Sequence, residues 1–142
     1  MSQNANPINP PEGYKPFRDV IPAITHVGPF YYLSRDGQLR VGFRADDYHI
    51  NASGSVHGGL MMMLADFTLC SLAIHGTDEG CATISFNSEF VAPAMHRQWV
   101  DASAEILRRT GSMVFLRGSV TGDGELALNF SGTVRRIRSK KN

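Results

Sequence analysis

The hydrophobic pattern of the chain is dominated by one long apolar segment, residues 60–74. Leu, Met, Ala and Phe fill this segment, and neither proline nor glycine interrupts it before Gly76. Such a composition favours an α-helix of about four turns. At about 100° per residue, apolar side chains point to every side of this helix, which is typical of a helix buried on most sides. Asp66 is its one charged residue, and a buried charge needs a partner or a chemical task.

Alternation of polar and apolar residues predicts strands at residues 30–34, 38–45, 82–91, 98–107, 113–120 and 125–137. The turn Arg35-Asp36-Gly37 joins the first two strands as a hairpin. The predicted order is two strands, the helix, and then four strands in a meander, without the strand–helix alternation of a doubly wound fold. We therefore expect an α+β fold in which an antiparallel sheet wraps deeply around the helix and a second subunit covers the rest of it.

Composition and charge narrow the class of protein. The chain has 142 residues, 42% of them hydrophobic and 19% charged, which suits one domain with a core, predicted here at residues 14–138. A net charge of +1 argues against a nucleic-acid surface. The chain lacks an apolar run of about 18 residues and an apolar signal core, so we expect a cytoplasmic protein without a membrane segment. Two cysteines make no disulfide framework, and both are predicted to be free thiols.

The two ends of the chain are polar. Residues 1–13 are rich in Asn and Pro, and we expect them to be disordered. The C-terminal end carries the cations Arg135, Arg136, Arg138, Lys140 and Lys141, and residues 139–142 are predicted to be a basic tail. A solvated, solubilising end is one interpretation of these charges, and a contact with a phosphate-bearing ligand is the other.

The polar loop before the helix carries the second chemical candidate. His57-Gly58-Gly59 stands where the helix begins, and unpaired N–H groups at a helix start can bind an anion or a developing oxyanion. Asp66 follows Gly58 by eight residues, so the two lie about 12 Å apart along one helix. One carbonyl needs contacts of about 3 Å to both groups. Either the two groups come from different copies of the chain, or Asp66 only completes a buried hydrogen-bond network.

The stretch Asn51-x2-Gly54-x-Val56-His57-Gly58-Gly59, followed by Asp66, resembles the signature of PaaI-like acyl-CoA thioesterases of the hotdog fold. Residues 83–94, TISFNSEFVAPA, resemble the strand of that family that leads into a Pro-Ala bend. The resemblance covers roughly residues 25–137. It implies the hotdog fold, in which a curved antiparallel β-sheet wraps around one long central helix.

The resemblance also implies a role for each matching residue. The Gly58 backbone N–H would polarise the thioester carbonyl, and Asp66 from the partner subunit would act as nucleophile or general base. Asn51 would orient the attacking water or the carbonyl, and His57 would support the loop and the carbonyl. Thr83 matches a small hydroxyl position near the acid, where it could position water. One N–H donor of this kind typically lowers the barrier by about 3 kcal/mol.

Further residues are candidates for substrate binding. Some relatives carry Ser or Thr one turn after the acid, where this chain has Cys70, which we expect only to line the pocket. The methionine run is either adaptable core or part of an acyl channel. The residues beside the break near position 110 are either contacts for coenzyme A or solvated residues of a sheet edge. The full set is Gly59, Met62, Met63, Cys70, Arg108, Arg109, Gly111 and Ser112.

Other chemistries find less support in the sequence. His26, His49, His75 and His96 are scattered without a metal-ligand spacing, so we expect structural histidines and no metal. A G-x-S-x-G elbow and a phosphate loop are also missing. We expect no cofactor, because coenzyme A is part of the substrate.

The sequence therefore predicts an acyl-CoA thioesterase that hydrolyses an acyl- or aryl-acyl-CoA to the free acid and CoA. We expect a homodimer, with a homotetramer built as a dimer of dimers, and sites at the subunit interface. Two alternatives remain. One is a hotdog module that binds acyl-CoA without catalysis, for which a buried acid opposite a carbonyl clamp would be unnecessary. The other is a hotdog enoyl-CoA hydratase or dehydratase, in which His57 and Asp66 would transfer protons.

Overall fold

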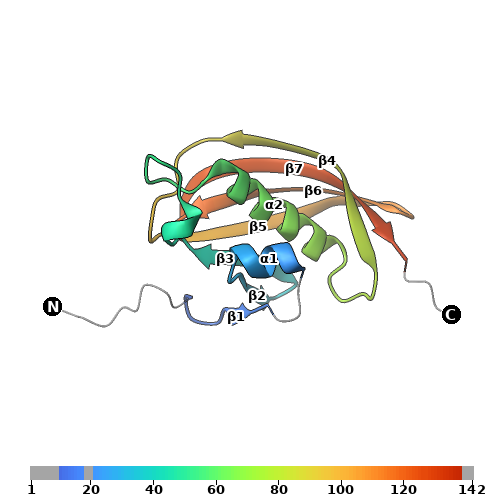
Figure 1. The fold of residues 1–142 in the computed structure, drawn as a ribbon. Coiled ribbons are helices and arrows are strands. Elements are labelled where there is room, and N and C mark those ends of the chain that lie inside the picture. Colours follow the sequence, from blue (N-terminus) through green and yellow to red (C-terminus); the bar gives the residue numbers. More distant parts are fainter. Residues whose placement is uncertain (1–9, 18–20, 139–142) are drawn as a thin grey trace.

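The computed structural model describes residues 10–17 and 21–138, which form a curved antiparallel sheet around a central helix (Figure 1). The central helix is α2 (Gly58–Ala73), and a short helix, α1 (Pro22–Val27), and a 3-10 turn, η1 (Asp47–His49), precede it. The strands are β1 (Lys15–Pro16), β2 (Tyr31–Arg35), β3 (Gln38–Arg44), β4 (Gly80–Phe90), β5 (Trp99–Arg109), β6 (Met113–Gly122) and β7 (Glu125–Ile137). The predicted α+β architecture is confirmed.

The strand order corrects one prediction. The order across the sheet is β1-β2-β3-β5-β6-β7-β4, so only β5, β6 and β7 form a meander. The expected four-strand meander after the helix is wrong, because β4 pairs with β7 at the edge and β5 returns to pair with β3. The chain crosses the concave face of the sheet as α2 and then begins β4 beyond β7. Helix α2 contacts β3, β5, β6, β7 and β4. Alternation within a strand reveals its faces but not its neighbours.

Parts of the predicted ends lie outside the described residues. These are residues 1–9 of the start and the basic tail, residues 139–142. The described part of the start is tied to the outer face of the sheet. The Tyr14 hydroxyl donates to Oδ1 of the buried Asp101 at 2.7 Å, and Arg40 donates to the other carboxylate oxygen at 2.7 Å. Two donors thus satisfy a carboxylate that would otherwise be costly to bury.

Helix α2 begins two residues before the predicted start, and its first turn explains why. His57 is the N-cap residue: its Nδ1 atom accepts a hydrogen bond from the Gly59 amide at 3.0 Å. Its carbonyl oxygen accepts hydrogen bonds from the amides of Leu60 and Met61. A capping side chain can stabilise a helix start that propensity alone disfavours, here two glycines. The helix ends at Ala73, and Gly76 follows with a φ of 77°, in the left-handed region that favours glycine.

The concave side of the sheet buries one side of α2. The buried residues of the helix are Met61, Leu64, Ala65, Phe67, Thr68, Leu69, Leu72 and Ala73. The helix packs closely against β7 because this strand has a glycine at the point of contact. A Cβ atom added to Gly132 would lie 2.6 Å from Cδ1 of Leu69. A side chain at this position would therefore push the helix away from the sheet.

The opposite side of α2 is only partly covered in a single chain. Met62 is 37% exposed, and Met63, Asp66 and Cys70 are half-buried. The sheet therefore covers one side of the helix rather than all of it. That a second subunit covers the other side stays a prediction.

Candidate active site

The loop between η1 and α2 is closed by the side chain of Asn51. Its Oδ1 atom accepts hydrogen bonds from Ser53 N, Ser53 Oγ and Ser55 N at 3.0, 2.8 and 3.2 Å. Its Nδ2 atom donates to Ser55 Oγ at 2.9 Å. Because Asn51 Nδ2 carries two hydrogens, one N–H of this exposed amide stays available to a ligand. Asn51 thus shapes the loop, and its predicted role toward water or a carbonyl stays a prediction.

The Gly58 amide differs from the other amides of the first helical turn. The Gly59, Leu60 and Met61 amides donate to His57, whereas no acceptor for the Gly58 N–H lies among the described residues. Gly58 lines a hollow of about 360 Å³ together with Asn51, Met61 and Phe90. A Cβ atom added to Gly58 would lie 3.0 Å from the Phe90 ring, so the backbone is close to an aromatic wall. An unpaired N–H at the start of a helix is suited to an anion or an oxyanion.

Asp66 lies in the middle of α2 and faces β4. The Thr83 hydroxyl donates to Asp66 Oδ1 at 2.5 Å, and Cys70 Sγ lies 3.4 Å from Thr83 Oγ. Half-buried among Met62, Met63 and Cys70, the carboxylate keeps one strong donor and remains accessible. A carboxylate in such surroundings can act as a base or as a nucleophile.

Two thiols complete the surroundings of Asp66. Cys70 and Cys81 are both half-buried, and both are free thiols, as predicted. The neighbouring Cys81 and Thr83 side chains lower the pKa of the Cys70 thiol, and burial and the Asp66 charge oppose this effect. The neighbouring Cys70 thiol, together with burial, raises the pKa of Cys81.

The sequence reasoning did not select Cys81 or Phe90. Cys81 precedes Thr83 by two residues on β4, so both side chains point to the same face of the strand. This spacing could have revealed Cys81, since Thr83 was already a candidate. The contact of Phe90 with Gly58 depends on the curvature of β4 toward the start of α2, and no local pattern encodes that curvature.

The predicted site residues fall into separate groups within one chain. Asn51 and Gly58 meet at the start of α2 beside Met61, which was not predicted, and Gly59 lies beside the His57 ring there. Asp66, Cys70 and Thr83 meet about two turns further along the helix, roughly 12 Å from Gly58 by the rise of a helix. The single chain therefore does not bring the acid and the amide to one carbonyl.

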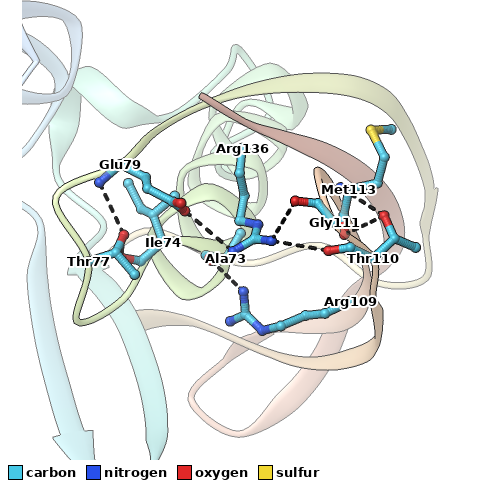
Figure 2. A network of polar contacts seen from close by, with 9 residues as sticks. All are labelled: Ala73, Ile74, Thr77, Glu79, Arg109, Thr110, Gly111, Met113 and Arg136. Carbon is cyan, nitrogen blue, oxygen red and sulfur yellow. Dashed lines mark hydrogen bonds and ion pairs between the residues drawn. The ribbon is translucent and has the colours of Figure 1, made fainter. Parts of the chain in front are cut away.

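Two of the predicted contacts for coenzyme A, Arg109 and Gly111, take part in a polar network at the other end of α2 (Figure 2). Arg109 donates to the Ala73 carbonyl at 3.0 Å, and Arg136 donates to the carbonyls of Thr110 and Gly111 at 3.1 and 3.0 Å. Arg136 also lies 3.5 Å from the Glu79 carboxylate. These contacts attach the end of the helix to the β5–β6 turn. Arg108 and Ser112 are exposed beside this network, and their predicted contact with coenzyme A stays a prediction.

A buried histidine, His49, also stabilises the start of α2. His49 is 1% exposed; its Nε2 atom donates to the Val27 carbonyl at 2.7 Å, and its Nδ1 atom accepts from the Asp46 amide at 2.9 Å. The His49 carbonyl accepts a hydrogen bond from the His57 amide at 2.9 Å. Burial lowers the pKa of His49, and the hydrogen bond to Val27 opposes this effect. His49 thus links α1, η1 and the cap of α2, in line with its predicted structural role.

One group of metal-type side chains was not anticipated. Asp46, Asp47 and His96 place their ligand atoms within 4.8 Å of one another, and His96 Nε2 lies 2.8 Å from Asp47 Oδ1. Asp47 is 87% exposed, and Asp46 already accepts a hydrogen bond from the Asp47 amide. This surface pair is typical of a solvated ion pair.

The comparisons with known proteins identify the family. The family model of the thioesterase superfamily matches residues 53–127, which include the end of the loop, α2 and strands β4 to β6. This chain belongs to the thioesterase superfamily. The predictions of the family and of a thioester hydrolase are confirmed at this level.

Individual relatives agree with this assignment. The Pseudomonas aeruginosa protein PA0474, which carries an esterase name, is 27% identical over 128 residues, covering 88% of this chain and 96% of that protein. The structure of the BH2602 protein of Bacillus halodurans with CoA superposes with a TM-score of 0.75 at 21% identity, covering 87% and 83% of the two chains. Escherichia coli PaaI, from the phenylacetic acid degradation operon, superposes with a TM-score of 0.75 at 16% identity, covering 83% and 86%. These likenesses confirm the hotdog fold.

None of the helices in residues 10–17 and 21–138 is long and apolar enough to cross a bilayer.

Proposed function

We propose that this thioesterase hydrolyses acyl- or aryl-acyl-CoA to the free acid and CoA at a site that two protomers share. Gly58 of one protomer would bind the thioester carbonyl, and Asp66 of the other would supply the carboxylate. The observation that supports the proposal is that a single chain holds its two functional groups too far apart to act on one carbonyl. One is an N–H at the start of α2 for which residues 10–17 and 21–138 supply no acceptor, and the other is a half-buried carboxylate about two turns away.

The surface of the chain offers a place for the second protomer. Strand β4 lies at the edge of the sheet, is 11 residues long, and exposes Ile84 and Phe90 by 58% and 56%. A long edge strand with exposed apolar side chains is a template for pairing with another chain. Thr83, which binds Asp66, and Phe90, which lies against Gly58, both belong to β4. Edge-to-edge pairing of two β4 strands would therefore bring both halves of the site to one interface.

The reaction follows from these groups. The Gly58 N–H would donate to the thioester oxygen and stabilise the negative charge that develops there. Asp66 would either remove a proton from an attacking water or attack the carbonyl itself to form an anhydride that water then hydrolyses. Collapse of the tetrahedral intermediate would break the C–S bond and release the CoA thiolate, which takes up a proton. Thr83 would orient the carboxylate, and the second N–H of Asn51 could orient the carbonyl or the water.

The experiment is a panel of acyl- and aryl-acyl-CoA thioesters, with release of free thiol as the readout and Asp66→Asn as the control. Thiol release by the wild type that disappears in Asp66→Asn supports the proposal. Binding of the thioesters without thiol release would establish the non-catalytic module instead. Hydration of an enoyl-CoA without hydrolysis would establish the hydratase, which no contact of His57 favours, because its Nδ1 atom caps the helix.

A further inference from the structure

Thr83 has two neighbours but only one hydroxyl proton. Its Oγ atom lies 2.5 Å from Asp66 Oδ1 and 3.4 Å from Cys70 Sγ. An ionised carboxylate can only accept, so the proton of Thr83 belongs to the short contact with Asp66. In the contact with Cys70, the thiol must then be the donor and Thr83 Oγ the acceptor. The result is a directed pair of hydrogen bonds, from Cys70 to Thr83 and from Thr83 to Asp66.

The secondary structure holds this pair in place. Cys70 follows Asp66 by one helical turn, so both side chains lie on the same face of α2. Thr83 and Cys81 lie two residues apart on β4 and point together toward that face. The order of donors is therefore Cys70 and then Thr83, and it ends at the Asp66 carboxylate.

We propose that Cys70 is a positioning residue that acts through Thr83 to keep the Asp66 carboxylate ionised and fixed in orientation. This inference rests on the proposed function of Asp66 and gives Cys70 a role beyond the predicted lining of the pocket. Hydrogen bonds donated to the charged form of an acid favour that form. Donors in a chain also polarise one another, so loss of the thiol weakens the bond from Thr83. Thr83 would lose its fixed rotamer as well, because without Cys70 its oxygen has one partner instead of two.

The test must take into account the side chains that face Asp66. Cys70 lies on its own helix, and Thr83 with Cys81 behind it lies on β4. The partner subunit would add its own loop in the proposed dimer. A thiol is a weak donor, so we expect an effect well below that of removing the acid itself.

The test is the pH dependence of kcat/KM for the intact protein as wild type, Cys70→Ala and Cys70→Ser. In Cys70→Ala the acidic limb of the pH profile, where kcat/KM declines as the pH falls, moves to higher pH. At a pH on that limb, kcat/KM falls about threefold to tenfold, the scale of one neutral hydrogen bond. Cys70→Ser keeps a donor at this position and returns the limb to its wild-type position.

Two outcomes would overturn the inference. One is an acidic limb that stays in place in Cys70→Ala, and the other is an equal displacement in Cys70→Ala and Cys70→Ser, which would indicate packing. Titration of the Asp66 carboxyl carbon by 13C NMR, assigned with Asp66→Asn, follows the same group without an activity assay. Full activity of Asp66→Asn would defeat the proposed function, whereas an inactive Asp66→Asn with an unmoved limb in Cys70→Ala would defeat only this inference.

Discussion

The two ends of helix α2 differ in how their polar groups are hydrogen-bonded. At the C-terminal end, the carbonyls of Cys70, Leu72, Ala73 and Ile74 all accept hydrogen bonds, the Ala73 carbonyl from Arg109. At the N-terminal end, the cap uses three amides of the first turn, and the fourth has no acceptor in the described chain, that of Gly58. The first end is held together by its own contacts. The second is ready for a ligand.

This difference in hydrogen bonding distinguishes the end of α2 that contributes to stability from the end that is available for function. The composition of the two ends does not distinguish them. Both ends contain glycine and hydroxyl side chains next to a helix terminus, and the sequence made candidates of both. A polar group that is already paired contributes mainly to folding, because a ligand would have to displace its partner. A group without a partner can bind a ligand at no such cost. Substitutions at the two ends should therefore affect different measurements.

The largest effect is expected at Asp66, the acid beyond the N-terminal end. Asp66→Asn keeps an oxygen that can accept from Thr83 but removes the basic carboxylate, so kcat should fall at least about a hundredfold. The melting temperature should change little. Thiol release and a thermal melt on the same preparation measure the two effects. Near-wild-type turnover in Asp66→Asn or Asp66→Ala would show that the acid is not catalytic.

The next effect is expected at the N–H of Gly58. Gly58→Pro removes this donor at the first helical position, where proline is well tolerated, and His57 already has the extended φ and ψ of −56° and 129° that suit a residue before proline. We expect kcat to fall about a hundredfold or more. Gly58→Ala is the matched control, since it adds a similar Cβ against Phe90 but keeps the N–H. Equal losses in the two variants would mean that crowding, rather than the donor, matters here.

A substitution at the C-terminal end should have the opposite effect. Arg136→Met removes the hydrogen bonds to Thr110 and Gly111 and leaves Glu79 without its cation, at a cost of about 2 kcal/mol in the free energy of unfolding. The turnover of the folded fraction should stay close to that of the wild type. Chemical denaturation measures the stability, with the exposed neighbour Arg135→Met as control. A higher KM for acyl-CoA at unchanged stability would instead support a contact with the phosphates of the ligand.

The smallest effect is expected from a substitution of His49, whose carbonyl accepts the hydrogen bond of the N-cap residue His57. Burial lowers the pKa of His49 in the folded chain, so the unfolded chain binds the proton more readily, with a pKa of about 6.5. Stability should therefore decline as the pH falls below about 6.5. His49→Gln should be less stable at neutral pH but should show a flatter dependence in urea unfolding between about pH 7.5 and 5.5. A slope as steep as that of the wild type would assign the pH dependence to other groups.

The sequence revealed most of the elements but less of their arrangement. Alternation located every strand of more than two residues, and the predicted strand at residues 125–137 matches β7 at both ends. It could not locate β4 beside β7, because pairing partners depend on the path of α2 across the sheet. Asp66 stood out as one charge in an apolar segment. Thr83, by contrast, was selected only through the family resemblance.

The details of the candidate site depend on contacts that the sequence does not encode. Nothing local distinguishes Gly58, whose amide finds no acceptor in the described part of the chain, from Gly111, whose carbonyl accepts from Arg136. The same is true of Arg109, a predicted ligand contact that instead binds the end of the helix. The link from Cys70 to Asp66 passes through a residue on another element and appears only when α2 and β4 are packed together.

The central claim is that Gly58 and Asp66 act together from different protomers, and a mixed dimer tests it most directly. Asp66→Asn and Gly58→Pro chains with different affinity tags can be co-expressed, and the hybrid isolated by two purification steps. The hybrid should recover up to half of the wild-type activity, because one of its two sites combines an intact Gly58 with an intact Asp66. A hybrid as inactive as its parents, or a wild type that is fully active as a monomer, would contradict the shared site.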